Sequence, residues 1–273
     1  MVEDSKLEES TDAAAGIKAD QAEGLRSMFG SQEPRVVCMS CALDADTASV
    51  MTLGTAHALR LQNQRVLLID EIPLQERRDI HGLAYPVRYD IAQVLENDIP
   101  LEKAIKKAEE NLWYATGLRM DRSYLKHKLR PPALIQRILK SKIELDLILI
   151  ATKNPIEGVL RAYAHDILHL VVCAPEDASM IQALEFIRSI SYRTDGAKIP
   201  VLIIGGDSET AGQEAFDRLQ AASQSLMEQP LESMGWISAV TIPNSTKSSK
   251  QPAGLILPAT LYAKLAGTTL QLS

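Results

Sequence analysis

Two pairs of side chains in this 273-residue sequence have spacings that occur in chemically active sites. Cys38 and Cys41 form a C-x-x-C pair, the spacing of redox-active thiols. His165 and His169 flank Asp166 in a variant of the H-E-x-x-H pattern of zinc-binding helices. Cys38 lies inside an apolar run typical of a strand, and His169 enters another such run. We therefore expect packing roles for both pairs, with no redox centre and no metal site.

Charged side chains suggest two further sites. Asp44 and Asp46 follow the first apolar run, and they could bind magnesium or a basic partner. We expect instead that Asp46 or Thr47 caps the helix that follows. Arg119–Lys142 is strongly basic, although the chain carries a net charge of -6 that argues against general nucleic-acid binding. This segment forms either a solvated helix face or a contact with an acidic partner or anionic lipid.

The elements that would position these residues alternate between strand and helix. Short apolar runs lack polar alternation, as buried parallel strands do, and helical stretches separate them. This pattern predicts a doubly wound, mainly parallel α/β sheet of about six to eight strands, with helices on both faces and ligands at the carboxyl ends of the strands. The predicted strands are 35–40, 65–70, 145–150, 167–173 and 200–204, with a weaker one at 236–241, and the predicted helices are 47–61, 122–142, 176–191 and 209–228.

One domain accounts for most of the chain. Residues 1–34 are expected to form a flexible N-terminal tail, 35–242 the α/β domain, and 243–273 a linker with a short apolar C-terminal tail. That tail either packs on the domain or is a degraded membrane-targeting helix. No apolar run reaches the roughly 18 residues of a membrane span. We expect a cytoplasmic protein whose membrane contact, at the inner membrane or cell pole, is at most peripheral.

The order of segments resembles that of MinD/ParA-type ATPases from Asp20 to about Thr241. In that family a first strand leads into the deviant phosphate loop K-G-G-x-G-K-[ST] and then a helix. Arg35–Ser40 is similar to that strand, and His57–Asp70 is similar to the helix end and second strand, without a gap between them. The resemblance therefore assigns the loop positions to Leu43, Asp44, Ala45, Asp46, Thr47, Ala48 and Ser49.

This assignment implies that the ATP site has degenerated. Both loop lysines are replaced, by Leu43 and Ala48, and no loop glycine remains to turn backbone N–H groups toward phosphate. The family aspartate that orders magnesium corresponds to Ala151, the second acid after the second strand to Ile72, and the adenine-binding asparagine to the Gly205–Gly206 strand end. The family uses ATP and magnesium. For this chain we expect no cofactor and no catalytic residue, although an unusual working ATPase remains the alternative.

An N-terminal motif points to the FlhG branch of the family, which regulates flagellar number. The segment 20–26 (DQAEGLR) resembles its D-Q-A-x-x-L-R motif, which docks on the SRP-type GTPase FlhF and stimulates it. Segments 89–104, 174–179 and 208–219 resemble further stretches of that branch. The resemblance implies partner binding by Asp20, Gln21, Ala22, Leu25 and Arg26, with flagellar basal-body proteins as further candidate partners. The alternatives are a plain surface helix at this position and a MinD-like scaffold used in secretion or envelope biosynthesis.

Overall fold

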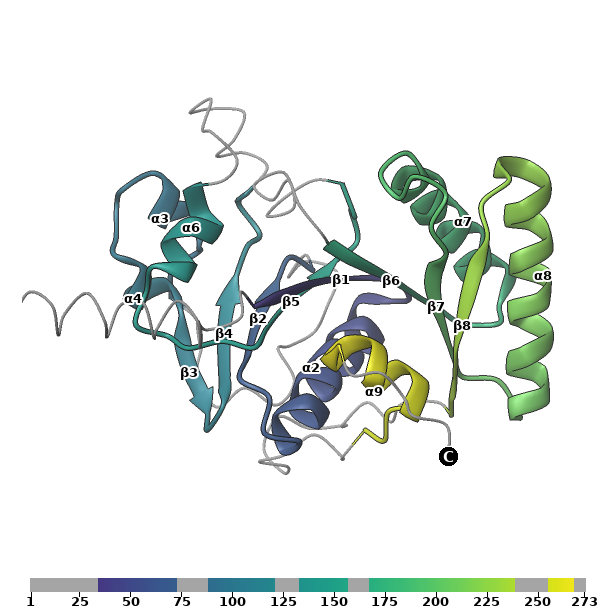
Figure 1. Cartoon of the computed structure of the whole chain (residues 1–273), viewed down its shortest axis with the longest axis horizontal. Coiled ribbons are helices and arrows are strands. Elements are labelled where there is room, and N and C mark those ends of the chain that lie inside the picture. The colour runs from purple at the N-terminus through teal and green to yellow at the C-terminus, as the bar shows by residue number, and fades with distance from the viewer. Residues whose placement is uncertain (1–33, 73–87, 121–132, 157–166, 239–254, 268–273) are drawn as a thin grey trace, which may run out of the picture. The chain divides into compact units, whose positions relative to one another are not determined.

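The computed structural model of the chain describes residues 34–72, 88–120, 133–156, 167–238 and 255–267. These residues belong to one compact unit, Pro34–Ser273. Their centre is an eight-stranded sheet in the order β3-β4-β2-β5-β1-β6-β7-β8 (Figure 1). Among the strands that the structure describes, only β3 runs antiparallel to its neighbour. The strands are β1 (Arg35–Ala42), β2 (Val66–Asp70), β3 (Lys106–Glu109), β4 (Leu112–Thr116), β5 (Leu147–Thr152), β6 (Ile167–Cys173), β7 (Ile199–Ile204) and β8 (Leu231–Ile237).

The predicted doubly wound sheet is confirmed. The five main predicted strands are β1, β2, β5, β6 and β7, which lie side by side in the middle of the sheet and are almost wholly buried. Because these strands are parallel, the carboxyl ends of all five lie along the same side of the sheet. Successive residues of each strand point to opposite faces of the sheet. Because nearly all of them are apolar, both faces must be covered by other elements.

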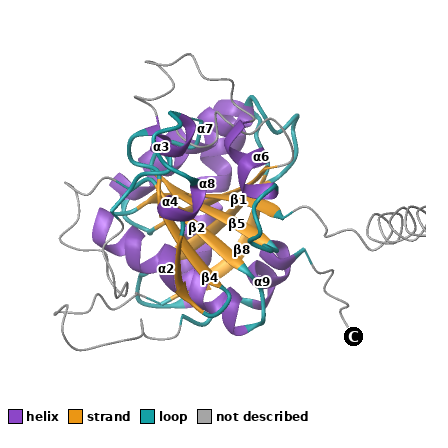
Figure 2. Cartoon of the chain, turned by 90° about the vertical axis from the view of Figure 1, so that its left-hand side faces the viewer, coloured by secondary structure: helices purple, strands orange, loops and turns teal. Residues whose placement is uncertain are grey.

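Helices cover the two faces, as the strands between helices in Figure 2 show. On one face α2 and α9 enclose a core with one set of alternating strand residues, among them Met39 and Leu149. On the other face, α3, α4 and α6 cover the end near β4, and α7 and α8 cover the end near β8. The helices are α2 (Ala45–Leu61), α3 (Ala92–Leu95), α4 (Leu101–Ala104), α6 (Ala133–Leu139), α7 (Asp177–Ser191), α8 (Glu209–Met227) and α9 (Ala259–Ala266).

Both edges of the sheet depart from the prediction. The β3–β4 hairpin was not predicted, because β3 has the sequence KKAE and its side chains are exposed or half-buried. Strand β8 begins at Leu231, five residues earlier than predicted. Its buried residues Leu231, Met234 and Ile237 are three apart, because a register shift near Gly235 interrupts the alternation. An edge strand with such a bulge has no simple periodic pattern in the sequence.

The segment assigned to a C-terminal tail contributes to the core where the structure describes it. Leu261 and Leu265 of α9 are buried against the sheet. Lys264 pairs with Glu232 of β8 at 2.7 Å, and the Thr260 hydroxyl donates to the Met234 carbonyl. The apolar face of α9 is thus covered by the protein, which excludes a free membrane-targeting helix here. No helix among the described residues is long and apolar enough to cross a membrane.

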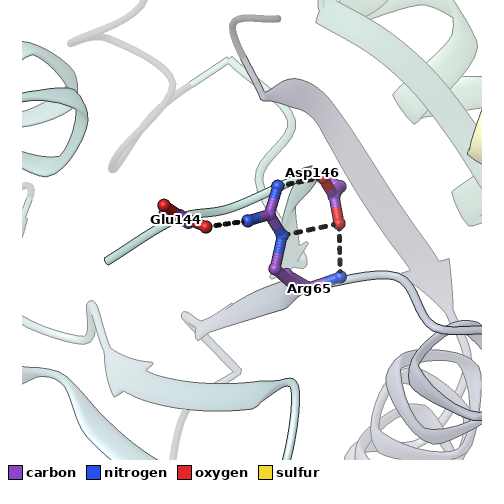
Figure 3. Close-up of polar contacts among 3 residues, drawn as sticks. All are labelled: Arg65, Glu144 and Asp146. Atoms are coloured by element: carbon purple, nitrogen blue, oxygen red, sulfur yellow. Dashed lines mark hydrogen bonds and ion pairs between the residues drawn. The ribbon is translucent and has the colours of Figure 1, made fainter. Parts of the chain in front are cut away.

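One ion-pair cluster joins the amino ends of β2 and β5. The guanidinium of Arg65 lies between the carboxylates of Asp146 and Glu144 (Figure 3). It donates to Asp146 Oδ2 at 3.0 Å through Nε and to Oδ1 at 2.7 Å, while the Arg65 N–H also donates to Oδ2. The hydrogen bonds from Arg65 hold the pKa of Asp146 below its usual range, although partial burial opposes this. The cluster thus connects β2 and β5 at their amino ends, whereas the candidate site lies at the carboxyl ends of the strands.

Candidate site at the carboxyl ends of the strands

The junction between β1 and α2 contains the seven loop positions assigned from the sequence. Only Leu43 and Asp44 lie between the strand and the helix, which begins at Ala45. The last five positions are therefore helical rather than part of an extended loop. Ala48 is fully buried and Leu43 and Ser49 nearly so. Without glycine, these residues continue as a helix. The Thr47 N–H donates to the Asp44 side chain and the Ala48 N–H to the Asp44 carbonyl, so both of these donors already have acceptors within the protein.

Asp44 caps this helix, so the expectation that Asp46 or Thr47 would do so is wrong. One Asp44 oxygen accepts the Thr47 N–H at 3.0 Å, and the other accepts the Thr47 hydroxyl at 2.5 Å. Partial burial opposes ionisation of Asp44, but the hydrogen bonds from Thr47 outweigh it and lower the pKa of the carboxyl, with help from the charge of Lys153. Asp44 therefore places a negative charge at the helix end that a bound phosphate would occupy.

The neighbouring strand ends offer few acidic groups to a ligand. Ala151, at the position of the family's magnesium aspartate, is fully buried and pairs with Met39 and Asp70 on the adjacent strands. Ile72 is also buried, in the core beneath α2. Asp70 is buried too and accepts hydrogen bonds from the Tyr114 hydroxyl at 2.7 Å and from the Ile72 N–H at 3.0 Å. The carboxylate nearest the missing acids thus has a structural role.

The end of β7 is shaped by two glycines with positive φ, Gly205 at 86° and Gly206 at 80°. The carbonyl of Gly205 accepts the indole N–H of Trp236 at 2.6 Å. Trp236 in turn packs so closely on Gly212 of α8 that a Cβ there would lie 2.3 Å from the ring. The glycine pair thus turns the chain into α8 and presents no side chain where the resemblance places an adenine-binding asparagine.

A cleft of about 560 Å³ remains at this edge of the sheet, next to Asp44. It lies between the ends of β1, β6 and β7 and the first turns of α2 and α7. Ser179 of α7 joins two of these strands, because its hydroxyl donates to the Ala42 carbonyl and accepts the Ala174 N–H. Sequence reasoning missed Ser179, Glu176 and Gln182 as lining residues. Their position directly after a central strand was the available signal, since ligands bind at such strand ends.

Cys38, Cys41 and His169 of the two candidate reactive pairs are all buried in strands of the sheet. Cys38 and Cys41 are buried in the cores on opposite faces of the sheet, so their thiols cannot form a local redox pair. Burial raises the pKa of Cys38 to about 12 and raises that of Cys41 further. His169 is buried in β6, and burial, followed by the charge of Arg193, lowers its pKa to about 4. Within the described ranges, no three metal-ligating side chains lie together.

Some predicted residues lie outside the described ranges. These include the whole N-terminal motif with Asp20, Gln21, Ala22, Leu25 and Arg26, as well as His165. The basic segment 119–142 is described only at its two ends. Arg137 in α6 binds the Val94 carbonyl and Asn97, so this cation stabilises the α3–α6 contact.

Comparison with known proteins supports the fold. No family model and no curated protein sequence matches the chain. Solved structures do match. The MinD cell division protein of Aquifex aeolicus is 21% identical with a TM-score of 0.60, over 88% of this chain and 100% of that chain. A ParA family ATPase of Chlorobium tepidum TLS is 14% identical with a TM-score of 0.55, over 86% and 93% of the two chains.

A third structure, the McdA–ATP complex of Cyanothece, is 15% identical with a TM-score of 0.54, over 89% of this chain and all of the other. These identities are low, but the alignments span nearly the whole of each relative. The described chain therefore has the single-domain α/β fold of the MinD/ParA-type P-loop ATPases.

Proposed function

We propose that this chain is a MinD/ParA-type protein that acts through protein contacts and has lost ATP binding. The observation that carries the proposal is the β1–α2 junction, where the Asp44 carboxylate caps α2. A phosphate at this position would have to displace the Asp44–Thr47 hydrogen bonds. It would also meet a like charge, at a cost of about 1 to 4 kcal/mol at 4 Å separation.

Other residues around the junction support the same proposal. The chain has Ala48 where the second loop lysine would stand, and that residue lies on the buried side of α2. Ala151 cannot order magnesium, since it has no polar side-chain atom. The loss of a cation, a metal ligand and the glycine cradle removes three separate sources of phosphate affinity.

Calorimetry tests this proposal directly. Titration of the full-length protein with ATP and magnesium is expected to give no saturable heat at micromolar concentrations. A micromolar Kd, about -8 kcal/mol, would contradict the proposal and favour an unusual working ATPase. A hydrolysis assay with malachite green checks turnover independently, and heat-denatured protein gives its background.

We further propose that the chain is a regulator of flagellar number of the FlhG type. This assignment rests on the segment 20–26 (DQAEGLR) and on the resemblance of 89–104, 174–179 and 208–219 to that branch. One of the similar structures is a MinC:MinD complex from Aquifex aeolicus, so the fold has supported protein contacts in that case. We expect the partner to be an FlhF-like GTPase. If the partner instead belonged to a secretion or envelope pathway, the chain would still act by binding a protein, but it would serve that pathway instead of flagellar assembly.

A further inference from the structure

We propose that the outward face of α7 is a surface on which two copies of this chain associate as an antiparallel helix pair. Association through this face goes beyond the proposed function, because it requires no nucleotide. The face combines exposed apolar side chains with charges whose positions are complementary to those of a second, antiparallel copy.

Helix α7 has one buried side and one exposed side. The buried side packs on the sheet, in the same layer as α8 (Figure 1). Its residues are Met180, Ala183, Phe186, Ile187 and Ile190. These residues recur every three or four positions, as expected of one side of a helix. The opposite side therefore faces away from the core of the protein.

Five residues form a stripe along this outward side, which we call the outer stripe. They are Ile181, Leu184, Glu185, Arg188 and Tyr192. Ile181 is 60% exposed and Tyr192 84% exposed, and the half-buried Leu184 lies between them. Scattered single apolar residues are normal on a protein surface, whereas several aligned on one helix face favour an interaction surface.

The charges of the outer stripe lie between its two exposed apolar residues. Glu185 and Arg188 are both exposed, and neither has an ion-pair partner in the part of the chain that the structure describes. Asp177, an exposed acid in the first turn of α7, differs from them because it lies 3.8 Å from Arg218 of α8. The outer stripe thus offers one acid and one base that can pair with another molecule.

An antiparallel pair of these helices would match every one of these groups. About a two-fold axis at the level of Phe186 and Ile187, residues equally far above and below that level face each other. Ile181 of one copy then lies level with Tyr192 of the second copy, and Glu185 lies level with Arg188. The symmetry makes each contact twice, so that two ion pairs lie between two apolar contacts.

This self-complementarity favours a second copy over other occupants. A membrane-binding helix face carries an excess of Lys and Arg, whereas the outer stripe has one acid and one base. A different protein would not require the charges and apolar residues to be placed symmetrically about one level of the helix. The contact is small, because a helix of 15 residues is about 22 Å long and about 10 Å wide. That is far below the roughly 800 Å² per partner of stable complexes, so we expect a weak, reversible dimer.

Sedimentation equilibrium of the full-length protein without nucleotide tests this surface. We expect a monomer–dimer equilibrium with a Kd on the order of 100 µM, measured from about 10 µM to about 500 µM protein. Ile181→Asp should weaken association at least about tenfold, because it places a charge in the apolar contact. Leu226→Asp is the matched control, since Leu226 is 73% exposed on α8 outside the outer stripe, and this variant should associate like the wild type.

A charge exchange tests the antiparallel arrangement. Glu185→Arg and Arg188→Glu should each weaken association about threefold to tenfold, because each places like charges opposite each other in both symmetric contacts. The double variant restores opposite charges and should return the Kd to within about twofold of the wild type. Circular dichroism checks that all variants remain folded.

Three results would overturn the proposal. One is a wild-type protein that stays monomeric at the highest concentration, and another is a dimer that Ile181→Asp weakens no more than Leu226→Asp does. The third is a double charge variant that associates no better than the single variants. None of these results bears on ATP binding, which the calorimetric titration tests separately.

Discussion

The carboxylate of Asp44 holds Thr47 through two hydrogen bonds, one from the backbone N–H at 3.0 Å and one from the hydroxyl at 2.5 Å. This contact starts α2 at Ala45, directly after a two-residue turn from β1. It gives the helix dipole an internal anion in place of an external one. The same pair therefore stabilises the start of α2, and under the proposed function it occupies the position at which a phosphate would bind.

Removal of this cap should reduce stability measurably. Asp44→Ala is expected to lower the free energy of unfolding by about 1 kcal/mol, because the Thr47 N–H loses its acceptor, and Asp44→Asn by much less. The lowered pKa of Asp44 fixes the sign of the pH dependence. The contribution of the ionised group is present above its ordinary pKa and is lost as pH falls through the folded-state pKa. Urea unfolding at pH 7 and pH 3 measures this, and an equal deficit of Asp44→Ala at both pH values would contradict it.

Restoring a loop lysine alone should damage the protein and leave nucleotide binding absent. Ala48 is 0% exposed and faces the core from α2, so Ala48→Lys would bury an uncompensated charge. The expected loss is roughly 3–5 kcal/mol, which corresponds to a decrease in Tm of about 10 °C. Gln62→Lys, at the exposed end of the same helix, serves as the control and should change Tm little. A stable Ala48→Lys variant that binds ATP would show that this position faces the ligand after all.

The Arg65–Asp146 pair should contribute to acid stability. Both side chains are about one-third exposed, so Asp146→Asn is expected to cost only about 1 kcal/mol at pH 7. Because hydrogen bonds from Arg65 lower the pKa of Asp146, this contribution is present above the ordinary pKa and disappears as pH falls through the lowered value. The difference in Tm between wild type and variant should therefore shrink as pH falls below the ordinary pKa range of an aspartate. Glu144→Gln is the control, since Glu144 is 80% exposed and its loss should have little effect.

The N-terminal motif should act on a GTPase if the FlhG assignment is correct. The full-length chain is expected to stimulate GTP hydrolysis by the FlhF-like protein of the same organism. Gln21→Ala should reduce stimulation more than binding, because a glutamine amide can orient an attacking water or support a catalytic group. Leu25→Ala should weaken binding itself through loss of an apolar anchor. Lys6→Ala changes the same segment outside the motif and should match wild type.

A GTPase rate that is unchanged by the full-length chain would remove the mechanism of the flagellar assignment. The proposed loss of ATP binding would be unaffected, because it rests on residues of the β1–α2 junction. A surface plasmon resonance measurement of the two proteins would then show whether they bind without stimulation.

The sequence by itself determined the centre of the fold. The five apolar runs form the five central strands, because a strand buried on both faces is apolar along nearly its whole length. Such an uninterrupted apolar run can be recognised in the sequence alone. The sequence also identified the β1–α2 junction and the absence of glycine and lysine from it. The edges of the sheet were not determined in this way. Strand β3 is polar, and β8 has a bulge at Gly235, so neither has the periodicity that marks a strand.

Only the tertiary structure decided which residues meet at the strand ends. In the structure the helix begins at Ala45, so Asp44 occupies the N-cap position, and Asp46 and Thr47 lie inside the first turn. The tertiary structure separated Cys38 from Cys41, since residues an odd number apart in a strand face opposite sides of the sheet. It also brought Glu176 and Gln182 of α7 beside Asp44, more than 130 residues away in the chain. Such proximity depends on the order of strands in the sheet, which local sequence patterns do not encode.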